Sequence, residues 1–215
     1  MPTLDVSKLA LKDVLRLLHL EEQLNGSFST LLTLDSLTEV ETQELLQISN
    51  DFRNYLTEAK VSEGLIKFLT VAPLMKLAGF YSYPIKLSVE DSINIVVEDE
   101  NTTISGRLDI LAVNSELTTT NTPFWLLVIE AKNSAIEVRQ GLPQLLTYAF
   151  KSLDGQSSVW GLATNGLQYL FVHLSQKNAP TYQLMPELYL LDAERSIQLL
   201  QVLKAICKLQ NVATV

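Results

Sequence analysis

Three charged residues stand in, or directly after, two short and otherwise apolar runs of this chain. Asp109 lies within residues 106–113 (GRLDILAV), whereas Glu130 belongs to residues 124–131 (FWLLVIEA) and Lys132 follows directly after them. Such runs predict buried strands, where an isolated charge costs several kcal/mol unless it is paired or binds a metal. Because side chains alternate across a strand, Glu130 and Lys132 should project from one face about 7 Å apart. If Asp109 lies on the neighbouring strand, the three groups converge.

Two carboxylates and an amine on one sheet face predict a site for a hard divalent cation and an activated water. Mg²⁺ prefers oxygen ligands, keeps several waters and is commonly held by one or two carboxylates, and we expect Mn²⁺ to substitute for it. Lys132 would orient the attacking water or offset the negative charge that builds on phosphorus. This is the chemistry of phosphodiester hydrolysis. From spacing alone, a Glu130–Lys132 pair at a strand end beside a solvated Asp109 is an equally good interpretation.

The order of these residues resembles a known catalytic pattern. Asp109, followed after about twenty residues by Glu130-x-Lys132, is similar to the pattern of the PD-(D/E)xK nuclease superfamily. Gln144 and Tyr148, the ends of the sequence QLLTY, resemble the Gln-x-x-x-Tyr element that follows the lysine strand in one branch of that superfamily. The resemblance implies that Gln144 and Tyr148 contact the nucleic-acid backbone or support the site.

Two further segments narrow the resemblance. Residues 159–171 (VWGLATNGLQYLF) resemble the strand, Asn-Gly turn and strand that come next in the N-terminal nuclease domain of type I restriction enzyme R subunits. Residues 62–66 (SEGLI) resemble the opening helix of that fold, whose glutamate, here Glu63, would join Asp109 and Glu130 as a metal ligand. A plain helix N-terminal charge also explains Glu63. The similarity covers roughly residues 58–175.

The resemblance therefore implies an α/β fold of the restriction-endonuclease type, with a central mixed β-sheet flanked by helices. Its implied activity is Mg²⁺-dependent endonucleolytic hydrolysis of DNA in a restriction-type system, with separate motor or specificity subunits, or a second copy in a homodimer, as further partners. The alternative is a catalytically inactive module of the same fold that binds nucleic acid or protein as a regulatory partner. Residues 1–56 are expected to form a helical accessory segment and residues 57–215 the nuclease domain, and the two are expected to form one compact unit.

Composition is typical of a globular protein in a reducing, cytoplasmic compartment. The chain has 215 residues, of which 47% are hydrophobic, and no apolar run approaches the roughly 18 residues that a membrane span requires. Its charged, amphipathic beginning is unlike a secretory signal, and Cys207 is its single cysteine, which excludes an internal disulfide. Two histidines and one cysteine are too few for an ordinary His/Cys zinc site.

The formal net charge of −8 opposes the nuclease interpretation. Proteins that hold nucleic acid non-specifically neutralise phosphates with lysine and arginine, and an acidic chain alone should bind DNA poorly at physiological salt. The sequence offers only Lys132, Arg139 and Lys151 as members of a local basic groove. A bound Mg²⁺ would offset part of the repulsion at the site itself.

The remaining patterns predict the elements that position these residues. Arg107, two residues before Asp109, would form a surface ion pair, contact a phosphate or keep Asp109 ionised. A capping box at residues 134–137 predicts a helix directly after Lys132, with a kink or a new start near Leu142. The other expected elements are helices at 4–24, 37–56, 61–71 and 193–209, strands at 85–89, 93–97, 102–113, 124–130, 159–163 and 168–173, and a polar loop at 114–122.

Overall fold

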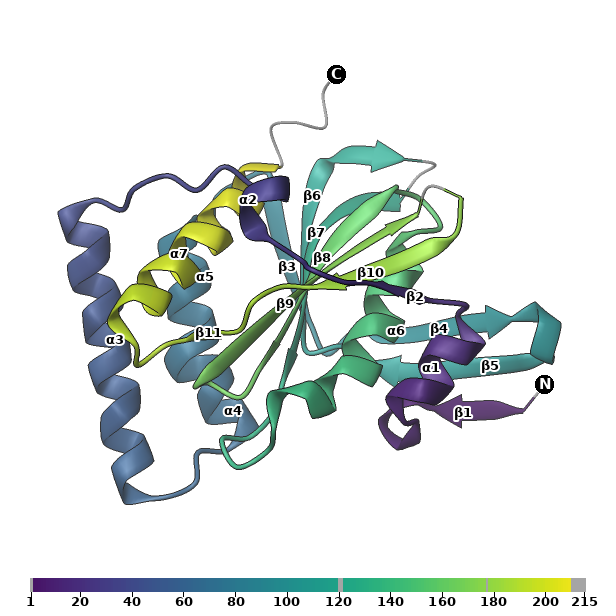
Figure 1. The fold of residues 1–215 in the computed structure, drawn as a ribbon, viewed down its shortest axis with the longest axis horizontal. Helices are drawn as coiled ribbons and strands as arrows, with labels where there is room; N and C mark the ends of the chain where they lie inside the picture. Colours follow the sequence, from purple (N-terminus) through teal and green to yellow (C-terminus); the bar gives the residue numbers. More distant parts are fainter. Residues whose placement is uncertain (1, 120–121, 177, 210–215) are drawn as a thin grey trace.

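An eight-stranded mixed β-sheet forms the centre of the computed structural model, which describes residues 2–119, 122–176 and 178–209. Its strands run in the order β2-β10-β9-β8-β7-β6-β3, and β11 pairs with β9 (Figure 1). The pairs β7/β8 and β2/β10 are parallel, and the other pairs are antiparallel. The bounds of these strands are β2 Glu21–Gln23, β3 Ile85–Val89, β6 Ile110–Thr119, β7 Thr122–Ala131, β8 Ser158–Thr164, β9 Gln168–Gln176, β10 Pro180–Leu184 and β11 Leu188–Tyr189.

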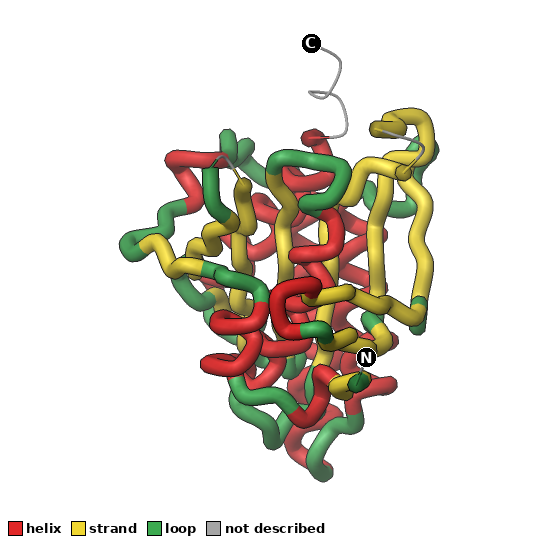
Figure 2. The backbone as a smooth tube through the Cα atoms, turned by 90° about the vertical axis from the view of Figure 1, so that its right-hand side faces the viewer, coloured by secondary structure: helices red, strands yellow, loops and turns green. Residues whose placement is uncertain are grey.

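A smaller sheet of three strands lies beside the large one, in the order β1-β5-β4. Its strands are β1 Thr3–Asp5, β4 Ser92–Val97 and β5 Thr102–Arg107. The N-terminal end of the chain lies beside this sheet (Figure 2). Since β5 ends at Arg107 and β6 begins at Ile110, the chain passes from the small sheet to the large one within two residues, one of which is Asp109.

Helices cover both faces of the large sheet, which is why β7 and β8 are apolar on both sides. The helices α3, α5 and α7 lie together on one face, whereas α6 lies on the other, between the large sheet and the small one, with α1 packed against it (Figure 1). The bounds are α1 Leu11–Leu17, α2 Phe28–Leu31, α3 Glu39–Glu58, α4 Glu63–Ile66, α5 Ala72–Ala78, α6 Leu142–Ser152 and α7 Ala193–Lys208, with a π-helical turn at Lys67–Val71 and 3-10 turns at Val6–Lys8, Glu98–Glu100 and Val138–Gly141.

The predicted mixed α/β fold, with a large sheet flanked by helices, is confirmed. The final helix begins where Asp192 caps it, by accepting a hydrogen bond from the backbone N–H of Arg195. The long helix α3 begins two residues later than predicted, because Thr38 and Glu41 form its capping box. No helix in the described part of the chain is long and apolar enough to cross a membrane.

Three local predictions are wrong. Residues 4–24 do not form one helix, since β1 and β2 flank the short α1, and these strands pair in parallel with β5 and β10. The supposed loop 114–122 is mostly strand, with a bulge near Asn114 where β6 and β7 shift register. No α-helix follows Lys132 directly, and the Ser134 hydroxyl instead accepts a hydrogen bond from the backbone N–H of Val61 at 2.9 Å. The predicted new start near Leu142 is confirmed, since α6 begins at that residue.

The division into an accessory segment 1–56 and a domain 57–215 stays a prediction. Val6 and Leu17, from the first segment, are buried in the cluster that lies between the large sheet and the small one. Phe28 and Phe52 are buried in the cluster on the opposite face. The first segment therefore contributes side chains to both cores of the molecule.

Candidate active site

Asp109 lies at the crossing between the two sheets and is bound to the end of β7. Its Oδ2 accepts a hydrogen bond of 2.7 Å from the backbone N–H of Ala131, in line with the antiparallel pairing of Ile110 with Ile129. The residue is only 8% exposed. The predicted neighbour relation of the two strands is therefore present, although Asp109 stands just before β6 rather than inside a continuous strand 102–113.

Glu130 is the most deeply buried carboxylate of this site, with 2% of its surface exposed. It lies on the sheet face that α6 covers, and a Cβ atom added to Gly141 would come within 3.4 Å of its Cγ. Its Oε1 accepts a hydrogen bond of 2.6 Å from the Lys132 ammonium, whereas its buried Oε2 has no hydrogen-bond partner among the described residues. Burial raises the pKa of Glu130 to about 8, against the opposing effect of Lys132, and the Asp109 charge adds to the rise.

Lys132 is held between the sheet and α6. Its ammonium donates 2.6 Å hydrogen bonds to Glu130 Oε1 and to Gln144 Oε1, and the Gln144 amide in turn donates to the Tyr148 hydroxyl at 3.4 Å. The Tyr148 hydroxyl also accepts a hydrogen bond of 3.2 Å from the backbone N–H of Arg107. Tyr148 is 1% exposed, so its side chain is covered by its neighbours.

Lys67 is a second site lysine, which the sequence analysis did not single out. Its ammonium lies 2.8 Å from Asp109 Oδ1, 3.2 Å from Glu90 Oε1 and 3.6 Å from Glu63 Oε1. Burial by itself would lower the pKa of Lys67, but the bonds to Asp109 and Glu90 raise it above its ordinary value. The sequence signal that was available is the spacing of four residues between Glu63 and Lys67 on one helical face.

Glu63 and Arg107 stand at the edge of the site. The pKa of Glu63 is raised, first by burial and then by the charge of Asp109, which places these two carboxylates within electrostatic reach. Arg107 forms an ion pair of 3.2 Å with Glu90. Of the three roles expected for Arg107, the structure shows the surface pair, and it is Lys67 that faces Asp109.

The residues fit a metal held by one or two carboxylates. No group of three or more His, Cys, Asp or Glu side chains that could hold a metal ion occurs within the described ranges. Mg²⁺, however, commonly uses only one or two carboxylates and completes its shell with water and substrate phosphate. The unpartnered Oε2 of Glu130 is an oxygen of the preferred kind, and a buried carboxylate oxygen without a partner calls for an explanation such as an ion. A cavity of about 380 Å³ is lined in part by Lys67, Glu90 and Asp109, and Glu130 is not one of its lining residues.

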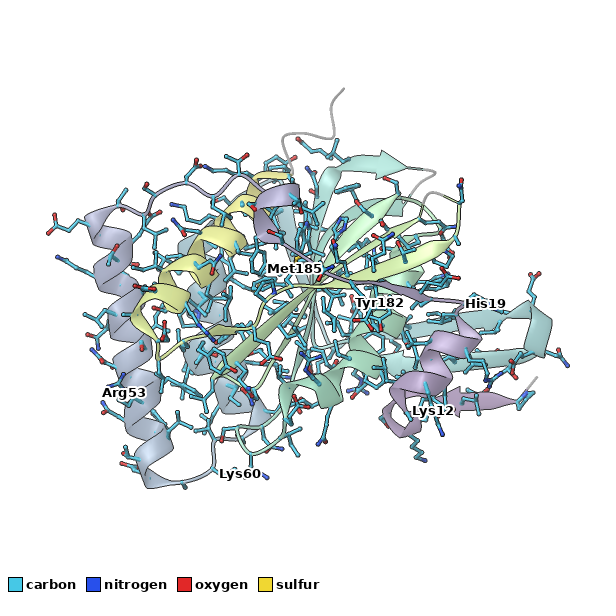
Figure 3. The ribbon with its side chains drawn as sticks, in the orientation of Figure 1. Lys12, His19, Arg53, Lys60, Tyr182 and Met185 are labelled. Carbon is cyan, nitrogen blue, oxygen red and sulfur yellow. The ribbon has the colours of Figure 1, made fainter. Side chains whose placement is uncertain are left out.

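The three cations that a local basic groove would need, Lys132, Arg139 and Lys151, are all in ion pairs. Arg139 pairs with Glu187 at 2.9 Å, and Lys151 pairs with Asp154 at 2.7 Å. Figure 3 shows the exposed Lys12, Arg53 and Lys60 on separate parts of the molecule, at α1, on α3 and in the loop after α3. These three side chains therefore do not make a common surface for a phosphate backbone.

Comparison with known proteins gives a weak structural similarity. No family model matches it, and no curated protein matches it. One similar solved structure is the fragment of a putative HsdR subunit of a type I restriction enzyme from Vibrio vulnificus YJ016, with a TM-score of 0.38 and 22% sequence identity over 53% of this chain and 21% of that one. The match thus spans about a fifth of the fragment, and at this score the likeness carries no weight for the chemistry of the site.

Proposed function

We propose that this chain is a metal-dependent phosphodiester hydrolase that cuts DNA as part of a restriction-type system. The proposal rests on one observation above all, the buried Glu130 carboxylate whose Oε2 lacks a partner while its Oε1 is bound to the Lys132 ammonium at 2.6 Å. Such a pair, with Asp109 fixed to the adjacent strand end, offers carboxylate oxygens and an amine from one sheet edge. The motif order Asp109, Glu130-x-Lys132 agrees with this chemistry.

Each residue of the site has a role in this mechanism. Asp109 and Glu130 would hold Mg²⁺ or Mn²⁺, with Glu63 as a third candidate ligand. When bound, the ion would polarise the phosphate and lower the pKa of a coordinated water. Lys132 would orient the attacking water by donating a hydrogen bond and would offset charge in the transition state, as fixed donors in a dry site do. The Gln144–Tyr148 pair positions the Lys132 ammonium, since Gln144 accepts one of its hydrogen bonds.

DNA binding would depend on more than this chain. With a formal net charge of −8 and with Arg139 and Lys151 in ion pairs, the chain has few cations left to neutralise phosphates. We therefore propose that separate motor or specificity subunits supply most of the DNA affinity. A weak intrinsic nuclease, active at low ionic strength, is the expected behaviour of the isolated chain.

The test is cleavage of plasmid DNA and of end-labelled duplexes by the purified chain at low salt, with Mg²⁺, with Mn²⁺ and with a chelator. We expect cleavage that needs the metal and that Asp109→Ala, Glu130→Gln and Lys132→Met each abolish. Glu44→Gln, which removes an exposed charge on α3, is the matched control and should cleave like the wild type. Equal background from the wild type and Asp109→Ala with both metals would refute the proposed activity.

A second candidate function is an inactive module of the same fold that serves as a binding or regulatory partner. The observation that favours it is the Lys67 ammonium at 2.8 Å from Asp109 Oδ1, because a lysine already satisfies the oxygen that a metal would need. Calorimetric titration with Mn²⁺ separates the two functions. Binding that Glu130→Ala abolishes supports the hydrolase, whereas no binding at millimolar Mn²⁺ supports the module.

A further inference from the structure

The Lys67 ammonium occupies a position that a cation of any kind would favour. Three carboxylates, those of Glu63, Glu90 and Asp109, lie within 3.6 Å of its nitrogen, and the Lys67 side chain is only 21% exposed. An ammonium has three N–H donors and no acceptor, so it can serve several of these carboxylates at once. The shortest of the contacts, at 2.8 Å, is to Asp109 Oδ1.

The backbone around Lys67 and its partners departs from regular geometry. Lys67 begins a π-helical turn, Lys67–Val71, between α4 and α5, and such turns in proteins frequently lie at functional sites. Glu90 has a φ of +60°, a conformation that costs energy for a residue other than glycine, and its N–H is bound to the Asp109 carbonyl at 3.2 Å. These two unusual backbone segments therefore carry the Lys67 amine and its second acceptor, Glu90, on either side of the chain at Asp109.

We propose that Lys67 is a positioning residue whose ammonium stands in for the metal on Asp109, and that a divalent cation binds only by displacing it toward Glu90. This inference rests on the proposed function and adds a regulation to it. At low metal concentration Lys67 would keep the metal off Asp109. The metal would bind only at a concentration high enough to compete with the Lys67 ammonium.

The competition follows from how the Asp109 oxygens are used. Each oxygen already has a donor, since Oδ2 accepts from the backbone N–H of Ala131 and Oδ1 accepts from Lys67, and the Lys67 side chain is the partner that can move. Displaced from Oδ1, Lys67 keeps a partner, because Glu90 Oε1 already lies 3.2 Å from its nitrogen. The cavity of about 380 Å³ is lined by Lys67, Glu90 and Asp109 together, so the amine has room to move between the two carboxylates.

The first test is calorimetric titration of the full chain with Mn²⁺. Hydrogen bonds to charged groups are strong enough that Lys67→Met should tighten metal binding about tenfold or more, whereas Lys67→Arg, which keeps the ion pair, should bind like the wild type. Lys60→Met removes an exposed lysine from the loop before α4 and is the matched control.

Each outcome of that titration decides something. The inference is supported if Lys67→Met binds Mn²⁺ more tightly than the wild type does, or if only Lys67→Met binds it. Equal or weaker binding by Lys67→Met than by a metal-binding wild type refutes the inference and leaves the proposed hydrolase standing. Absence of binding in both proteins refutes the inference and removes the metal from the proposed function as well.

A second test does not depend on one variant. Without metal, Lys67→Met removes the cation that Glu63, Glu90 and Asp109 share, so its melting temperature should fall and should then rise more on addition of Mn²⁺ than that of the wild type. Glu90→Gln should weaken Mn²⁺ binding in the wild type, because Lys67 loses its second partner, but it should have little effect in the Lys67→Met background. An equal effect of Glu90→Gln in both backgrounds would show that Lys67 is not the competitor.

Discussion

Replacing Glu130 by glutamine should stabilise the metal-free protein, and increasingly so as the pH rises. The pKa of Glu130 is raised from 4.5 to about 8 because burial disfavours the charged carboxylate more than the Lys132 ammonium stabilises it. Between these two values the folded chain keeps a proton that the unfolded chain has released, and stability therefore falls as the pH rises. Glu130→Gln removes this titration while it keeps the shape of the side chain.

The size of the effect follows from the shift. At about 1.4 kcal/mol per pKa unit, the ionised carboxylate costs the folded protein on the order of 5 kcal/mol above pH 8, and less than about 1 kcal/mol near pH 5. For a chain of 215 residues this corresponds to a difference of roughly 10 °C in melting temperature at high pH. Urea unfolding in the presence of a chelator, followed by the fluorescence of the two tryptophans at pH 5, 6, 7, 8 and 9, measures it.

The wild type and Glu130→Gln should therefore have similar free energies of unfolding at pH 5 and diverge up to about pH 8. The difference should shrink again at pH 8 when Mn²⁺ is added, since the ion would bind only the wild-type carboxylate. Glu44→Gln, on the exposed side of α3, should show no such divergence. If the free energies of unfolding of the wild type and Glu130→Gln instead change with pH in parallel, then Lys132 fully compensates the Glu130 charge. Burial would then not raise the pKa of Glu130.

Three smaller perturbations test the surroundings of the site. Tyr148→Phe leaves the backbone N–H of Arg107 without its acceptor and should cost about 1–2 kcal/mol in urea unfolding, together with slower metal-dependent cleavage because Gln144 loses a partner. Gly166→Ala should cost about 2 kcal/mol, since this residue has a φ of +84° and its new Cβ would lie 2.5 Å from Phe52 Cζ, and a lower melting temperature measures the cost. Thr38→Ala removes the cap of α3 and should lower the free energy of unfolding by about 1 kcal/mol.

The sequence predicted the elements whose structure depends mainly on local residue pattern. The apolar run ending at Glu130 predicted a buried strand, and β7 Thr122–Ala131 lies there, with Glu130 and Lys132 in contact on one face. The helix predicted at 193–209 from its apolar face is likewise present as α7, and Asp192 caps it. Charges that survive inside an apolar run are conspicuous because burial makes them costly, and this is why Glu130 and Asp109 could be selected without a structure.

The sequence failed where distant segments decide the outcome. The strands β1 and β2 are three residues each and gain their structure from parallel pairing with β5 and β10, far along the chain. Lys67 resembles any lysine on an amphipathic helix, and its role emerges only because β6 starts at Ile110 and brings Asp109 within 2.8 Å of it. The local sequence around Lys67 carries no information about its contact with Asp109.

The charges of the site explain how an acidic chain can still receive a phosphate. Its ion pairs join four carboxylates, of Glu63, Glu90, Asp109 and Glu130, to three cations, of Lys67, Arg107 and Lys132, a formal charge of −1 when all are ionised. A phosphodiester also carries −1, so the metal-free cluster repels it once Glu130 is ionised, above its pKa of about 8. One divalent ion would change the cluster to +1 without any basic groove. If Lys67 moves to Glu90 and stays in the cluster, its charge is kept, and the proposed displacement that admits the metal would then also make the site attractive to a phosphodiester.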